Sequence, residues 1–113
     1  MSSGRVLVVE DNEAIRESLT DVLRTAGYRA DGATKSDAVA ELTKGDVALV
    51  VLDVGLDFSG LKLLDALAEK SPVILMSGQP ERRQVPRGPV YLPKPFAPQR
   101  LLDEVQRQLG SPN

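Results

Sequence analysis

The sequence predicts an α/β fold in which a parallel sheet is covered by helices on both faces. Short apolar runs alternate along the chain with amphipathic segments whose apolar residues recur at helical spacing, and the connections between them are short. A weaker strand over residues 28–33 falls between the first two helical segments. The apolar runs that we expect to form the other strands begin at Val6, Val47, Val73 and Val90.

The helical segments carry signals for their ends and for their buried faces. Asn12 is the expected N-cap of the first helix, and Gly27 is its expected stop. Ser36 is the expected cap of the second helix, which ends at Gly45, and the last helix covers residues 97–109. We expect the following residues to form the apolar stripes of the four helices: Ile15, Leu19, Val22, Leu23 and Ala26; Val39 and Leu42; Leu61, Leu64, Leu67 and Ala68; and Leu101, Leu102, Val105 and Leu109.

One connection departs from this alternation. Residues 78–89 contain three prolines and two glycines, and Val85 is their single large aliphatic residue. Proline costs about 3 kcal/mol inside a helix, and no apolar stripe is present to offset that cost. We therefore expect a shortened or missing helix here, with at most one turn.

Composition limits the classes of function. A chain of 113 residues fits one domain, with a flexible N-terminus over residues 1–4 and a tail over residues 110–113. Its net charge of −2 argues against a nucleic-acid partner. No apolar run approaches the roughly 18–20 residues that span a bilayer, so we expect a cytoplasmic location. Because the chain has no cysteine and no histidine, it can form no disulfide and carry no phosphohistidine.

Polar side chains stand where the apolar runs end. Glu10 and Asp11 follow the first run, Asp53 and Ser77 end two others, and Lys94 follows the last. The carboxyl ends of parallel strands meet at one edge of the sheet, which is where open α/β sheets bind ligands. Three carboxylates, a hydroxyl and an ammonium group therefore should converge there. This set of groups suits a divalent cation and a phosphoryl group.

Taken in order, these motifs resemble the receiver domain of two-component response regulators. The motifs are Val-Val-Glu-Asp-Asn (8–12), Leu-Asp (52–53), Met-Ser-Gly (76–78) and Tyr-Leu-Pro-Lys-Pro-Phe (91–96). Each motif alone is weak, but the ordered set covers essentially the whole chain. The resemblance implies a single receiver domain over residues 1–113. Its fold would be flavodoxin-like and doubly wound, with five parallel strands in the order 2-1-3-4-5.

The resemblance also implies a phosphoacceptor and a metal. Asp53 would accept a phosphoryl group from a histidine kinase or a histidine phosphotransfer protein. Mg²⁺ would be bound by Asp11 and Asp53, by the backbone carbonyl of Gly55, and by Glu10 largely through water. The domain would then be a signalling module of a phosphorelay and not an enzyme.

The remaining implied roles concern switching and partners. Ser77 and Lys94 would contact phosphoryl oxygens, and Tyr91 would act with Ser77 as a conformational switch. We expect a monomer or weak dimer with an unidentified downstream effector, and no contact with membrane or nucleic acid. The resemblance places the docking surface for the histidine partner at Ala14, Ile15, Ser18, Pro95 and Phe96.

Several departures and alternatives remain open. The loop over residues 54–60 is shorter than in the family and lacks its proline, and Gly55 would leave a phosphoryl group open to water. A pseudo-receiver, which binds partners without being phosphorylated, is one alternative. A haloacid-dehalogenase-like phosphatase would need a second acid at the position of Gly55. A flavin carrier is disfavoured because no phosphate loop rich in Gly, Ser and Thr follows the first strand.

Overall fold

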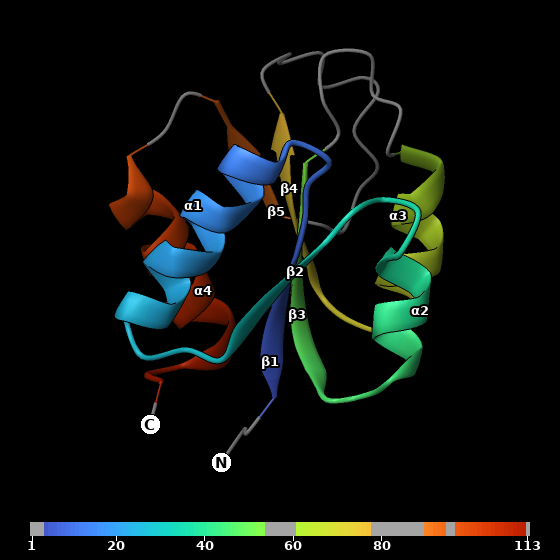
Figure 1. Cartoon of the computed structure of the whole chain (residues 1–113). Coiled ribbons are helices and arrows are strands. Elements are labelled where there is room, and N and C mark those ends of the chain that lie inside the picture. Colours follow the sequence, from blue (N-terminus) through green and yellow to red (C-terminus); the bar gives the residue numbers. More distant parts are fainter. Residues whose placement is uncertain (1–3, 54–60, 78–89, 95–96, 113) are drawn as a thin grey trace.

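The computed structural model describes residues 4–53, 61–77, 90–94 and 97–112. Within these residues, the strands form one parallel sheet in the order β2-β1-β3-β4-β5 (Figure 1). This order confirms the predicted doubly wound, flavodoxin-like fold. The strands are β1 (Arg5–Val9), β2 (Ala30–Ala33), β3 (Val47–Asp53), β4 (Val73–Ser77) and β5 (Val90–Pro93). The helices are α1 (Glu13–Thr25), α2 (Ala38–Thr43), α3 (Leu61–Ala68) and α4 (Pro98–Leu109).

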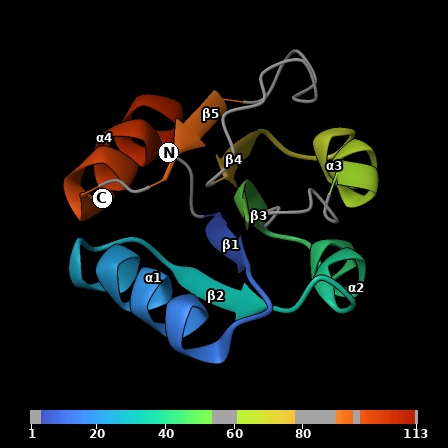
Figure 2. The same cartoon turned by 90° about the horizontal axis from the view of Figure 1, so that it is seen from above.

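The helices divide between the two faces of the sheet. Helices α1 and α4 cover one face, and α2 and α3 cover the other (Figure 2). Alternate residues of β1 follow this division, because Val6 and Val8 pack with the first pair of helices while Leu7 and Val9 pack with the second. Burial on both faces explains why the central strands read as continuous apolar runs.

Both predicted ends of α1 are confirmed. The side-chain oxygen of Asn12 accepts a hydrogen bond from the backbone N–H of Ile15 at 3.0 Å, which satisfies one of the free donors of the first turn. At the other end, Gly27 has a φ of 102°, a left-handed conformation that glycine adopts without steric cost.

The expected start and buried face of α2 are partly wrong. Ser36 does not cap this helix, because its hydroxyl lies 3.1 Å from that of Thr34 and the helix begins two residues later, at Ala38. Val39 is 45% exposed, and the buried residues of α2 are Ala38 and Leu42. Leu42 is thus confirmed as a core residue, while Ala38 takes the place predicted for Val39.

Two other expected core residues lie outside the core. Ile15 of α1 is 42% exposed, and Ala68 of α3 is exposed as well. Both lie in a terminal turn of their helix, where a side chain has fewer neighbours. The weaker strand is also shorter than expected and begins at Ala30, because the N–H of Tyr28 bonds back to the carbonyl of Leu23 and closes the C-terminal end of α1.

The shortened helix expected between β4 and β5 falls on residues 78–89, which lie outside the described part of the chain, so it stays a prediction. None of the helices in the described ranges is long and apolar enough to cross a membrane.

Arg5 connects three elements at the opposite edge of the sheet from the strand ends discussed below. This buried arginine donates to the Asp31 carboxylate at 2.8 Å and to the Glu41 carboxylate at 3.1 Å. Its other terminal nitrogen donates to the Glu41 carbonyl at 2.9 Å. Hydrogen bonding from Arg5 lowers the pKa of Asp31, while hydrogen bonds from Lys44 and then from Arg5 lower the pKa of Glu41.

We predict that Arg5→Met lowers the free energy of unfolding by about 1–3 kcal/mol at neutral pH, because two carboxylates and a carbonyl lose a charged donor. The folded-state pKa values of Asp31 and Glu41 are depressed, so this stabilisation is present above their unfolded pKa values and is lost as pH falls through the folded ones. The penalty of the substitution should therefore shrink in acid, as urea denaturation followed by circular dichroism would measure.

The control is Lys44→Met, which removes an exposed partner of the same Glu41 and should cost less than about 1 kcal/mol. Equal losses in the two variants, or a penalty for Arg5→Met that does not change with pH, would contradict this account of the cluster.

Candidate functional site

The carboxyl ends of four neighbouring strands meet at one edge of the sheet, the upper edge in Figure 1. The register aligns these ends. Val9 of β1 pairs with Leu52, Asp53 of β3 pairs with Met76, and the last residues of β4 and β5 pair with each other. The polar residues that end or follow these strands therefore lie at the same edge. Each is held there by a buried strand that has little freedom to move.

Asp53 and Lys94 form an ion pair at the centre of this edge. The Asp53 side chain is almost inaccessible, with 4% of the residue exposed. The Lys94 ammonium donates a hydrogen bond to the Oδ2 atom of Asp53. Burial of a carboxylate is costly unless it is paired and hydrogen-bonded, and Lys94 provides both forms of compensation.

Glu10 is a second buried acid beside Asp53, and it is incompletely compensated. Its Oε2 accepts a hydrogen bond from the N–H of Asn12 at 3.0 Å, but its Oε1 is buried with no hydrogen-bond partner among the described residues. Burial raises the pKa of Glu10 to about 7. The Asp53 carboxylate raises it as well, because it accepts a hydrogen bond from the protonated acid and repels the ionised one.

Asp11 is placed differently from the other two acids. Its carboxylate is 56% exposed and is bound by Lys35, from the connection between β2 and α2. The Lys35 N–H donates to Oδ1 at 2.8 Å, and the Lys35 ammonium lies 3.4 Å from Oδ2. The backbone hydrogen bond from Lys35 is the main cause that lowers the pKa of Asp11. Over the described ranges, no three acidic side chains are gathered closely enough to hold a metal ion.

The structure therefore brings together Glu10, Asp53 and Lys94, and leaves Asp11 turned toward Lys35. Of the other predicted site residues, Ser77 is the last residue of β4, and Tyr91 of β5 pairs with Leu75. The side chains of Ser77 and Tyr91 lie outside the described part of the structure. Gly55, Pro95 and Phe96 lie outside the described residues.

Sequence reasoning missed two contributors to this edge. Lys35 is an ordinary charged residue in a polar connection, and nothing in the sequence marks its contact with Asp11. Arg16 was also missed, although its Nη1 donates to the carbonyl of Glu10 at 2.9 Å. The glycine at position 32 is the signal that could have pointed to Arg16, because glycine inside a strand often marks a close approach.

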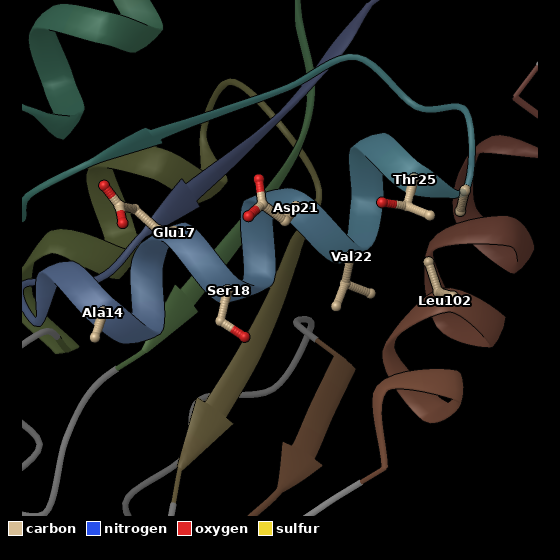
Figure 3. A pocket seen from close by; sticks show the side chains of 8 residues that line it. Ala14, Glu17, Ser18, Asp21, Val22, Thr25 and Leu102 are labelled. Carbon is tan, nitrogen blue, oxygen red and sulfur yellow. The ribbon is translucent and has the colours of Figure 1, made fainter.

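An open groove runs beside the predicted docking residues, between α1 and α4 (Figure 3). Its volume is about 720 Å³. Two of the predicted docking residues, Ala14 and Ser18, line it, and the exposed Ile15 stands on the same helix. Two carboxylates, of Glu17 and Asp21, stand along it as well. The full lining is Ala14, Glu17, Ser18, Asp21, Val22, Thr25, Ala26 and Leu102.

Solved structures that share this fold with the chain include two that are at least 30% identical to it. NtrX from Brucella abortus, solved in complex with ADP, is 30% identical and superposes with a TM-score of 0.80 over 93% of this chain and 26% of its own. The beryllofluoride-activated NtrC4 receiver domain dimer is 32% identical, with a TM-score of 0.78 over 92% of this chain and 94% of its own.

Sequence comparison agrees with the structural likeness. The transcriptional regulatory protein HprR of Escherichia coli is 33% identical over 93% of this chain, which spans about half (51%) of the length of HprR. Residues 6–106 match the model of the response regulator receiver domain family. With the parallel sheet in the order expected of that fold, this match shows that the chain belongs to the family of response regulator receiver domains, the signalling domains of two-component systems.

Proposed function

We propose that this domain accepts a phosphoryl group on Asp53, from a histidine kinase or a histidine phosphotransfer protein, as one step of a phosphorelay. The observation that carries the proposal is the buried Asp53 carboxylate, held by Lys94 at the carboxyl edge of the sheet beside a second buried acid. Such a position gives the carboxylate a fixed orientation toward an incoming group and excludes most competing water.

The transfer is a single displacement at phosphorus. A carboxylate oxygen of Asp53 bonds to phosphorus while the bond from phosphorus to the donor imidazole nitrogen breaks, and the electron pair of that bond stays on the imidazole. Charge spreads over the equatorial phosphoryl oxygens, so catalysis depends on positioned positive charge and hydrogen-bond donors. Lys94 supplies the charge, and Ser77, at the end of β4, supplies a hydroxyl. Asp53 is modified once per transfer, so the domain acts as an acceptor in signalling.

The residues present fit a divalent cation such as Mg²⁺, which prefers oxygen ligands and retains several waters. Glu10 Oε1 is a buried oxygen that has no donor among the described residues, and the Asp53 carboxylate lies next to it. The exposed Asp11 carboxylate can join them by exchanging Lys35 for the ion, and the carbonyl of Gly55 completes the proposed set. When bound, Mg²⁺ screens the carboxylate charge from the anionic donor.

A pseudo-receiver remains the second candidate, and one observation favours it. Asp11 is engaged by Lys35, so the three acids are not gathered around a shared point in the described residues. If that arrangement persisted in the presence of Mg²⁺, the edge would serve for protein binding alone. Labelling with acetyl phosphate in the presence and absence of Mg²⁺ separates the two functions.

The partner surface that we propose is the exposed start of α1. Ile15 is one of two large hydrophobic side chains that are exposed in the described part of the chain, and it lies five residues after Glu10. Exposed apolar residues beside an active site make effective anchors for a partner. Ala14 and Ser18 border the groove along the same helix, and the proposed surface also includes Pro95 and Phe96.

We predict that Asp53→Asn abolishes incorporation of phosphate from acetyl phosphate, because the amide nitrogen and oxygen cannot replace the carboxylate nucleophile. Intact-mass spectrometry would show one added phosphoryl group in the wild-type protein with Mg²⁺, and hydroxylamine would remove it. Asp65→Asn, a change at an exposed aspartate of α3, should label as the wild-type protein does. Robust labelling of Asp53→Asn at another residue would refute the assignment.

A second prediction separates docking from chemistry. Ile15→Glu should slow phosphoryl transfer from a histidine kinase by at least about tenfold, the change expected for loss of an interface anchor, while labelling by acetyl phosphate is unchanged. Val39→Glu is the matched control, because Val39 is equally exposed but lies on α2, across the sheet. The rates can be followed with ³²P-labelled kinase. Equal slowing in both assays would indicate damage to the fold, and equal slowing by both variants would place the docking surface elsewhere.

A further inference from the structure

The side chain of Arg16 reaches from α1 to the turn that follows β1. Its Nη1 atom donates to the carbonyl oxygen of Glu10 at 2.9 Å and lies within hydrogen-bond distance, 3.3 Å, of the carbonyl oxygen of Asp11. A single guanidinium nitrogen thus contacts two consecutive peptide units. These units belong to the two acidic residues that head the proposed cation site.

The edge strand β2 has a glycine where the Arg16 side chain lies against it. A Cβ atom built at Gly32 would stand 2.7 Å from Cγ and 2.9 Å from Cδ of Arg16, closer than such atoms approach in proteins. The backbone of Gly32 is not in the left-handed region, so glycine is needed here for space and not for conformation. Any larger residue at position 32 would displace the stem of Arg16.

We propose that Arg16 is a positioning residue for the cation site, which it supports by fixing the backbone of Glu10 and Asp11, and that Gly32 makes this contact possible. The inference rests on the proposed function for the identity of the ion. The turn carries Glu10 inward and Asp11 toward the surface, so a small rotation of its peptides would move both carboxylates. Residues that orient metal ligands typically change metal affinity by about 10- to 100-fold when removed.

The sign of the effect distinguishes positioning from simple electrostatics. The Arg16 guanidinium is positive, so its charge repels a cation at this edge. If charge were its only influence, removing it would tighten the binding of Mg²⁺. If Arg16 holds the turn, removing it should weaken the binding, because the ligands lose their common orientation.

The test is a titration of the full chain with MgCl₂ by isothermal calorimetry. Arg16→Met keeps the aliphatic stem but removes the donors, and it should weaken Mg²⁺ binding by about tenfold. Arg16→Lys restores a charged donor and should recover part of the loss. Gly32→Ala leaves the guanidinium chemically intact but displaces it, so it should weaken Mg²⁺ binding to the same extent as Arg16→Met. If Arg16→Met does not fold, Gly32→Ala serves as the test in its place. The double variant should lose no more than either single one, because both act on one contact.

Arg24→Met is the matched control. Arg24 lies on the same helix and also contacts β2, where it bonds to the carbonyl of Ala30 and to Asp31, and in the described part of the chain its hydrogen bonds do not involve the acidic turn. An Arg16→Met protein that binds Mg²⁺ as tightly as the wild type, or more tightly, overturns the proposal. Equal weakening by Arg24→Met also overturns it.

A metal-free measurement separates this inference from the proposed function. The N–H of Asn12 donates to Glu10 within the same turn, so its hydrogen exchange should accelerate in Arg16→Met and remain unchanged in Arg24→Met. If the wild-type protein binds no Mg²⁺, the cation site is refuted. Faster exchange at Asn12 in Arg16→Met would still support the conclusion that Arg16 fixes the backbone of the turn. Unchanged exchange at Asn12 in Arg16→Met would show that Arg16 does not fix the backbone of the turn.

Discussion

Two buried carboxylates, of Glu10 and Asp53, lie beside the partly buried ammonium group of Lys94 at the carboxyl edge of the sheet, and the surrounding turns are arranged around this charge imbalance. Lys94 compensates Asp53 directly, but Glu10 keeps one buried oxygen for which the described ranges offer no donor, and its pKa is raised to about 7. Burial of such a group is unfavourable for folding alone. A divalent cation would relieve the imbalance, which links the cost in stability to the proposed chemistry.

The sheet makes this arrangement possible because it is buried on both faces. The strands that deliver the acids are apolar on both sides, so their ends are fixed in position while their terminal side chains remain at the edge. The surrounding turns then tune each acid separately. Lys35 engages Asp11, Asn12 bonds to Glu10, and Arg16 holds the backbone between them. The contacts to these acids thus come from the strand ends, from the first helix and from the connection after β2.

The amino-acid pattern predicted the features that depend on neighbouring residues. Apolar runs and their polar ends are local signals, and they predicted a parallel sheet with Asp53 and Lys94 at its carboxyl edge. The order of the strands was implied by the resemblance to receiver domains. The contacts of Asp11 with Lys35 and of Arg16 with Glu10 depend on how separate elements meet in space, which periodicity does not encode. The wrong prediction for Val39 has a similar origin, because a helix as short as Ala38–Thr43 gives too few repeats to determine which neighbour of Leu42 faces the core.

The most direct test of the central claim is a titration of the ¹⁵N-labelled protein with MgCl₂, followed by amide chemical shifts. The N–H of Lys35 donates to Asp11 and the N–H of Asn12 donates to Glu10. The Lys35 amide therefore reports on Asp11, and the Asn12 amide reports on Glu10. The account predicts that both shift together and saturate with a single 1:1 affinity, and that NaCl at equal ionic strength has no such effect. Unchanged shifts, or a response of Lys35 that follows ionic strength alone, would contradict it.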